Sequence, residues 1–422
     1  AAFDDLYELR LVVRDAAAGA AARSLAGSNS ATFSLPHSDA QGFAAIAVGA
    51  LLGSYLFDQF KGATKKDQRA PLTKITIHST HVRGASAQTI LSRTSVIAKY
   101  THIVRDLINT PPSHLTPSTF VAEFKKLAGS RVKVEILNEV QLKKGGYGGI
   151  IGVGQGSANP PRLLRLSYAP KGAKRRLALV GKGITFDTGG LALKPAQGME
   201  AMKSDMSGAA AVCAAALAIA ELKLPIAIDA WAPLAENMVS DTATRPSDII
   251  TIYGGKTVEV LNPDAEGRLI LADGLVRATQ VGKKAGGLDG IIDVATLTGA
   301  QVVALGTRTS AAMTNNDEFR EKFLTVASQT GEAFWPMPLP EELRASLDSP
   351  VADIANIGER MGSMLVAGLF LKDFIDPEIP WLHLDIAGPA YNESKAHGYT
   401  PVGGTGVALR TLVAFAEATS AR

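Results

Sequence analysis

Apolar runs rich in Val, Ile and Leu alternate with Ala-rich stretches over most of the chain beyond residue 170. Strands are predicted at 176–186, 225–234, 290–297 and 381–388, and helices at 207–222 and 267–279. The strand segments lack polar alternation, which is typical of strands buried on both faces by helices. The pattern predicts an α/β fold whose larger C-terminal domain contains a helix-flanked mixed sheet.

The first 95 residues have a different pattern. Short strands are predicted at Tyr7–Val13 and Lys74–Ser79, around an Ala- and Gly-rich helix between Gly42 and Phe60. Two strands and a helix at this spacing indicate a smaller N-terminal α/β domain over residues 1–95.

A helical stretch is predicted from about Ser92 to Leu107, where apolar residues recur at three- and four-residue spacing. The sequence NTPPSHLTPS then begins at Asn109, and its prolines forbid a continuous helix. We therefore predict a linker helix over 96–108 and the larger domain over 109–422.

Composition places the chain among ordinary globular proteins, with 46% hydrophobic and 20% charged residues. The one cysteine, Cys213, excludes an intramolecular disulfide and a Cys-based zinc site, and it favours a reducing, cytoplasmic location. The apolar stretch 42–57 is shorter than the ~20 residues of a membrane-spanning helix. The opening AAFDDLYELR, with two early acidic residues, is not expected to be a signal peptide.

Charge changes this picture little. The net charge is +3, and basic clusters occur at 61–69 and 171–176. Such clusters are more often solvated surface loops than nucleic-acid sites, so nucleic-acid binding is not expected.

Three segments place charged residues beside apolar strands. They are VGKGITFDTGGLALK from Val180, MKSDMSGAA from Met202 and NPDAEGRLILADG from Asn262. Buried charges are costly without partners, and strand ends in open α/β sheets are where ligands bind. The candidate residues are Lys182, Asp187, Lys194, Asp205, Asp264, Glu266 and Arg268.

The spacing of the carboxylates indicates a metal site. Asp264 and Glu266 are two residues apart, so on an extended segment both point to one face. Asp205 precedes a predicted helix, and Asp187 precedes a flexible Thr-Gly-Gly turn. Four carboxylates without histidine suit hard divalent cations, and two cations with bridging carboxylates would form a two-metal hydrolytic centre.

Charge counting agrees with two cations. Four carboxylates balance two divalent ions, while Lys194, Arg268, a bridging hydroxide and one anion beside Arg268 balance the rest. Lys182 is then expected to be a neutral amine, because neighbouring cations lower the pKa of a lysine.

Each residue alone has a simpler interpretation. Asp205 alone is more often a helix cap, Lys194 a solvated lysine, and Asp264 with Glu266 a surface turn. Lys182 lies in G-K-G, but the phosphate-loop pattern G-x-x-x-x-G-K-[ST] does not precede it. Met202 is more often core than pocket lining.

The three segments together resemble the leucyl aminopeptidase (cytosol aminopeptidase) family. NPDAEGRLILADG is similar to the family's N-T-D-A-E-G-R-L signature, and GKGITFDTGG and D-M-S-G-A-A occur where that family has them. The similarity extends from about Asn109 to the C-terminus, through DVATLTGA, ADIANIGERMGSMLVAG and HLDIAGPA. Residues 109–422 are thus expected to be the catalytic domain of a metal-dependent exopeptidase that removes N-terminal residues. It would prefer Leu- and Met-like residues but accept a broad range.

The resemblance implies a role for each candidate. Lys182, Asp187, Asp205 and Glu266 would hold the tighter metal, and Asp187, Asp264 and Glu266 the exchangeable one. Arg268 would hold a bicarbonate that acts as general base, and Lys194 would stabilise the tetrahedral intermediate. The side-chain pocket would be lined by Met202, Thr296, Leu297 and Gly299. The metals would be Zn²⁺ or Mn²⁺, with Mg²⁺ or Co²⁺ as alternatives.

The resemblance also implies a homo-hexamer of two stacked trimers with peptide substrates. One departure is Pro263, where the family usually has Thr, and this residue puts metal preference or affinity in question. Two other functions stay open from sequence. One is a DNA-binding role, which some bacterial members of the family have, and the other is phosphoester hydrolysis at the same centre.

Overall fold

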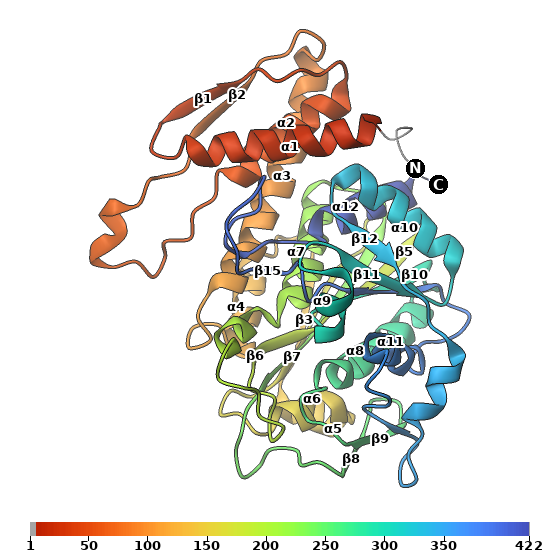
Figure 1. The fold of residues 1–422 in the computed structure, drawn as a ribbon. Coiled ribbons are helices and arrows are strands. Elements are labelled where there is room, and N and C mark those ends of the chain that lie inside the picture. The colour runs from red at the N-terminus through yellow and green to blue at the C-terminus, as the bar shows by residue number, and fades with distance from the viewer. Residues whose placement is uncertain (1–5, 422) are drawn as a thin grey trace.

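The computed structural model describes residues 6–421, with side chains from residue 14 onward. A small N-terminal part lies against a larger body, where Asp15 pairs with Arg410 at 3.6 Å and Arg23 donates to the Gly398 carbonyl at 2.8 Å. The long helix α3 extends from the small part into the larger one (Figure 1). The N-terminal elements are α1 (Leu6–Ser24), β1 (Ser30–Phe33), α2 (Ala40–Gly53), η1 (Ala63–Asp67), β2 (Lys74–Ile77) and α3 (Gly84–Asn109).

The N-terminal part differs from its prediction in three places. Tyr7–Val13, predicted as a strand, belongs to α1, because the Ala-rich sequence that follows extends the same helix. The second helix ends at Gly53 rather than Phe60, where the Ser54 amide donates to carbonyls of the last turn. The stretch predicted from Ser92 is part of α3, which begins eight residues earlier. The strand at 74–77 is confirmed, and it pairs in parallel with β1.

Glycine explains how α1 and α2 pack. A Cβ atom at Gly49 would lie 2.1 Å from the Asp15 carbonyl oxygen, and one at Gly53 would lie 2.2 Å from the Gly19 carbonyl oxygen. The two helix backbones are therefore in direct contact, which only glycine permits at these positions.

A mixed sheet forms the centre of the larger body, as predicted. Its strand order is β12-β11-β14-β10-β5-β7-β4-β3, with β6 pairing on β7. Strands β14, β10, β5 and β7 are mutually parallel, so their carboxyl ends lie at one edge. The strands are β3 (Lys133–Leu137), β4 (Arg162–Tyr168), β5 (Arg176–Gly181), β6 (Gly183–Asp187), β7 (Ala227–Asn237), β10 (Gly290–Ala295), β11 (Ser310–Thr314), β12 (Phe334–Pro336) and β14 (Trp381–Asp385).

Helices cover both faces of this sheet (Figure 1). Side chains of β5 alternate between two apolar clusters, with Leu177 and Leu179 in one and Ala178 and Val180 in the other. The first cluster contains α3, α4, α7, α10 and α12, and the second contains α5, α6, α8 and α11. The helices are α4 (Pro117–Leu127), α5 (Glu139–Gly145), α6 (Gly148–Gly154), α7 (Ser207–Glu221), α8 (Gly267–Lys284), α9 (Gly299–Leu305), α10 (Asp317–Thr330), α11 (Ser363–Lys372) and α12 (Leu409–Ser420).

Small elements complete the fold. They are η2 (Met199–Ser204), β8 (Asp248–Thr251), β9 (Thr257–Val260), η3 (Glu341–Leu347), β13 (Ile354–Ala355), β15 (Tyr391–Asn392) and β16 (Gly403–Gly404). In residues 6–421 one stretch, Met199–Glu221, is long and apolar enough to cross a membrane, but 94% of its apolar window is buried inside the fold.

Candidate metal centre

The carboxyl edge of the parallel strands brings the candidate residues together. Lys182 interrupts the predicted strand 176–186 between β5 and β6, and Asp187 ends β6. Asp205 lies between η2 and α7, and Glu266 immediately precedes α8. The three charged segments therefore converge at one edge of the sheet.

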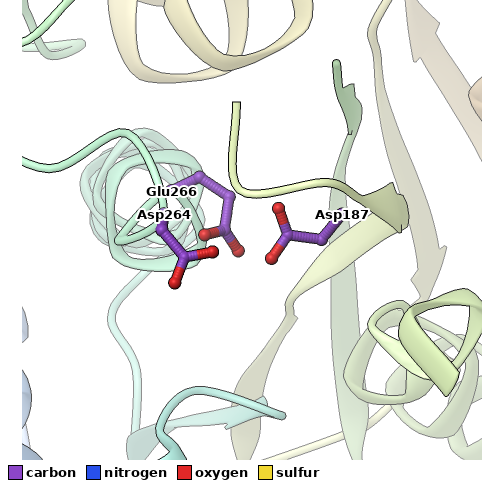
Figure 2. Close-up of side chains that lie close together, drawn as sticks. All are labelled: Asp187, Asp264 and Glu266. Carbon is purple, nitrogen blue, oxygen red and sulfur yellow. The ribbon is translucent and has the colours of Figure 1, made fainter. Parts of the chain in front are cut away.

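Three carboxylates face one another at this edge (Figure 2). Asp187, Asp264 and Glu266 each offer an oxygen, and these atoms all lie within 4.8 Å of one another. Asp187 and Glu266 are both 2% exposed, while Asp264 is half-buried. Such a cluster of hard oxygen ligands suits a divalent cation.

Two lysines compensate the carboxylates. The Nζ atom of Lys182 lies 2.8 Å from Asp205 Oδ1 and 2.8 Å from Glu266 Oε1, so it links Asp205 to the cluster. The Nζ atom of Lys194 lies 2.9 Å from Asp187 Oδ2 and also contacts Asp264 Oδ1. Both lysines are thus internal parts of the centre, and Lys194 is not the solvated residue that its local sequence favours.

Burial and charge shift these groups in opposite directions. Burial, together with the neighbouring Asp187 carboxylate, raises the pKa of Glu266, and burial raises the pKa of Asp205. Burial opposes the charge of Lys182, but the Asp205 and Glu266 carboxylates outweigh it and raise the pKa of Lys182. The metal-free centre therefore keeps Lys182 as an ammonium. The expected neutral amine requires added cations.

The segment that carries Asp264 is a turn and not the extended segment on which the spacing argument was based. The Ala265 amide donates to the Asn262 carbonyl at 3.0 Å, and the Asp264 amide donates to Asn262 Oδ1 at 2.9 Å. The two carboxylates converge because this turn leads directly into α8. Pro263 is the second residue of the turn, where proline is favoured and no N–H is needed. This departure from the family pattern therefore fits the local backbone.

Asp205 does not cap α7. That helix has no side-chain cap, and Asp205 Oδ1 instead accepts from the Thr296 hydroxyl at 2.7 Å. Its other oxygen, Oδ2, is buried without a hydrogen-bond partner among the described residues. An unsatisfied buried carboxylate oxygen needs an explanation, and a cation would supply the missing partner.

Arg268 lies behind the cluster in α8. It is 7% exposed, it donates from Nη1 to the Asn356 carbonyl at 2.7 Å, and its guanidinium lies 5.9 Å from the centroid of the Phe370 ring. Burial lowers the pKa of Arg268 to about 10, which still leaves it cationic at neutral pH. Its Nε has no partner in the described part of the chain, so it has capacity to bind an anion.

The four predicted pocket residues lie in two segments, with Met202 in η2 and Thr296, Leu297 and Gly299 between the end of β10 and the start of α9. The Thr296 carbonyl accepts from Lys182 at 2.9 Å, and the Leu297 amide donates to Asp385 at 3.1 Å. Met202 is half-buried in η2, which packs against β6. Gly299 is exposed at the start of α9, and a Cβ atom there would meet nothing within 4 Å. The Met202 carbonyl accepts from the Asp205 amide at 3.3 Å, and Thr296 alone of these four hydrogen-bonds to charged side chains of the cluster.

The sequence did not indicate Asn237. This residue ends β7, is 5% exposed, and donates from Nδ2 to Asp187 Oδ1 at 2.8 Å and to the Pro263 carbonyl at 3.1 Å. It therefore joins two of the candidate segments. Its position at the carboxyl end of an apolar strand could have identified it as a candidate site residue.

Comparison with known proteins places the chain in a family. The model of the cytosol aminopeptidase family, catalytic domain, matches residues 102–413. A probable cytosol aminopeptidase of Streptomyces avermitilis is 53% identical over 408 residues, which cover 96% of this chain and 79% of that protein. One from Micrococcus luteus is 50% identical over 414 residues, covering 95% and 80%.

Solved structures show the same fold. The bottromycin maturation enzyme BotP in complex with Mn matches with a TM-score of 0.90 and 38% identity, over 97% of this chain and 88% of that one. A variant of tomato leucine aminopeptidase matches with a TM-score of 0.86 and 35% identity, over 97% and 78%.

The fold, the carboxylate centre and these matches define a metal-dependent exopeptidase that acts at amino termini. More specifically, the chain belongs to the cytosol aminopeptidase family, as its sequence signature implied.

Replacing Glu266 should separate its effect on metal binding from its effect on the stability of the metal-free protein. We expect Glu266→Gln to abolish the rise in melting temperature that Mn²⁺ gives to metal-stripped protein, without destabilising the metal-free protein. The change would remove a candidate ligand and also one of the carboxylates that repel one another, while Lys182 keeps Asp205 as partner. A cation at 100 times its Kd stabilises a protein by about 2.7 kcal/mol, which calorimetry detects.

The control is Glu332→Gln, which alters a buried carboxylate that pairs with Arg410 and Thr411. Its Mn²⁺-dependent shift should equal that of the wild type. A wild-type shift in Glu266→Gln would contradict the role of Glu266 as a ligand.

Proposed function

We propose that this protein hydrolyses the N-terminal peptide bond of peptides at a two-metal centre, with preference for Leu- and Met-like residues. The observation that carries the proposal is the convergence of Asp187, Asp264 and Glu266 within 4.8 Å, in a chain of an aminopeptidase family. Neither DNA binding nor phosphoester hydrolysis gains support from the comparisons.

The ligand sets that we propose are those that the family resemblance implies. Asp187 and Glu266 would serve both cations, Lys182 and Asp205 would complete one site, and Asp264 the other. This division agrees with the ion pairs, because Lys182 bridges Asp205 and Glu266 while Lys194 bridges Asp187 and Asp264. We propose Zn²⁺ or Mn²⁺, with Mg²⁺ or Co²⁺ as alternatives. Mn²⁺ is supported by the relative solved in complex with Mn.

When bound, the two cations would polarise the scissile carbonyl and lower the pKa of a shared water. The chain's own residues do the remaining work. Lys194 directs its ammonium into the centre, where it would donate to the oxyanion that develops, a contact worth roughly 3–4 kcal/mol. Arg268, with its free Nε, would hold a bicarbonate that moves the proton to the leaving amine.

The substrate's free amino terminus should be essential. Metal-stripped protein is reloaded with Mn²⁺ or Zn²⁺ and assayed on Leu-p-nitroanilide and on its N-acetylated form. We expect metal-dependent release of p-nitroaniline from the free-amine substrate alone, because the blocked amine loses its contact at the centre. Equal cleavage of both substrates, or none with any metal, would refute the proposal.

Gly299 should influence side-chain selectivity. A side chain at this position would extend into open space beside Thr296 and Leu297, where we place the substrate pocket. We expect Gly299→Val to lower kcat/KM for Leu-p-nitroanilide relative to Ala-p-nitroanilide by about tenfold or more, since a methylene in a pocket is worth roughly 1–3 kcal/mol.

Gly129→Val is the control, because a Cβ atom there also meets nothing within 4 Å and the residue lies in the loop after α4. An unchanged Leu/Ala ratio in Gly299→Val would remove Gly299 from the pocket.

We further propose a cytoplasmic homo-hexamer of two stacked trimers. Large apolar side chains are exposed on three segments: Leu193 beside Lys194, Val303 on α9, and Met361 before α11, at 61%, 89% and 79% exposure. Sedimentation velocity should show six chains of 44.1 kDa each. A monomer at micromolar concentration would contradict the assembly.

A further inference from the structure

Asn356 is a fully buried amide that contacts the backbone around the metal-ligand turn. It directly follows β13, which pairs in parallel with β9, and its own amide donates to the Glu259 carbonyl at 2.9 Å. Asn356 is therefore anchored to the strand from which the turn at 261–266 continues.

Its side chain uses its full hydrogen-bonding capacity on that turn. Oδ1 accepts from the amides of Leu261 at 2.8 Å and Asn262 at 3.2 Å. Nδ2 donates to the carbonyls of Asn262 at 2.7 Å and Ala265 at 3.4 Å. An amide has two acceptor sites and two donors, and all four are engaged here.

The backbone of the same residue holds Arg268, whose Nη1 donates to the Asn356 carbonyl at 2.7 Å. Asn356 thus contacts the chain before Asp264, between Asp264 and Glu266, and at Arg268. Among the described residues it makes no hydrogen bond to a carboxylate of the cluster, unlike Asn237, which donates to Asp187. Its influence on the carboxylates therefore acts through the backbone.

We propose that Asn356 is a positioning residue that sets the metal affinity of the centre by fixing the turn between Asp264 and Glu266. The inference rests on the two-metal function proposed above. Only glutamine, which is one methylene longer, has a side-chain amide that also accepts twice and donates twice. An aspartate would place one carboxylate oxygen where Nδ2 is, facing the Asn262 and Ala265 carbonyls, which would repel it. Partners of metal ligands commonly change metal affinity 10–100-fold when mutated.

The test compares Asn356→Asp with Asn315→Asp. Asn315 is a matched control because its Oδ1 accepts from the Trp381 amide at 2.8 Å and its Nδ2 donates to the Ile379 carbonyl at 3.0 Å. It clamps the amino end of β14, at the opposite edge of the sheet. Metal-stripped protein is titrated with MnCl₂ by calorimetry and by the electron paramagnetic resonance of free Mn²⁺, and melting temperatures are recorded.

We expect Asn356→Asp to weaken at least one of two Mn²⁺ sites by about 10–100-fold. Asn315→Asp should bind as the wild type does, even if its melting temperature falls. Peptidase activity of Asn356→Asp should recover towards the wild-type kcat as Mn²⁺ is raised, which a general folding defect would not allow. If Asn356→Asp does not fold, Asn356→Ser is titrated in the same way with the same expected weakening.

Wild-type Mn²⁺ affinities in a folded Asn356 variant would overturn this inference and leave the proposed function intact. Equal weakening in Asn315→Asp would also overturn it, because the effect would then be unspecific. Failure of the wild-type protein to bind Mn²⁺ or Zn²⁺ would overturn the two-metal function, and the inference with it.

Discussion

The centre depends on compensation of like charges in a buried place. Asp187, Asp205 and Glu266 are each less than 10% exposed, and several such carboxylates together repel strongly where water is excluded. Lys182 and Lys194 offset part of this repulsion by bridging the carboxylates in pairs. The remaining excess of negative charge is what makes the edge of the sheet a place for cations. The surrounding fold must therefore hold the carboxylates close together against their mutual repulsion.

The parallel strands of the mixed sheet supply that restraint. Their carboxyl ends lie at one edge, and four of these ends place a polar residue there: Lys182 after β5, Asp187 on β6, Asn237 on β7 and Asp385 on β14. Two packed apolar faces fix the strands, so the polar ends have little freedom to move apart. Two amides, Asn237 and Asn356, then fasten the turn before α8 to the strands on either side of it.

The sequence predicted the parts of this design that have a strong local pattern. Apolar strands without alternation indicated a sheet covered on both faces, and three charged segments indicated the centre, with the family signature assigning individual residues. The local sequence pattern was not enough to predict the conformation of segments whose structure depends on their neighbours in the fold. Tyr7–Val13 has the composition of a strand but continues into an Ala-rich helix, and spacing alone could not show that Asp264 and Glu266 converge through a turn. The role of Asn356 could not be predicted from the sequence, because it depends on hydrogen bonds to residues some ninety positions away.

Thr296 connects the candidate metal centre with the proposed substrate pocket. Its hydroxyl binds Asp205 and its carbonyl binds Lys182, while its neighbours begin the wall of the proposed substrate pocket. A displacement of this residue by a substrate side chain would therefore act on two of the proposed ligands, Asp205 and Lys182. Such coupling is reciprocal by thermodynamic necessity. The identity of the bound metal would therefore shift which amino acids the enzyme prefers, so that selectivity belongs to the loaded protein and not to the polypeptide alone.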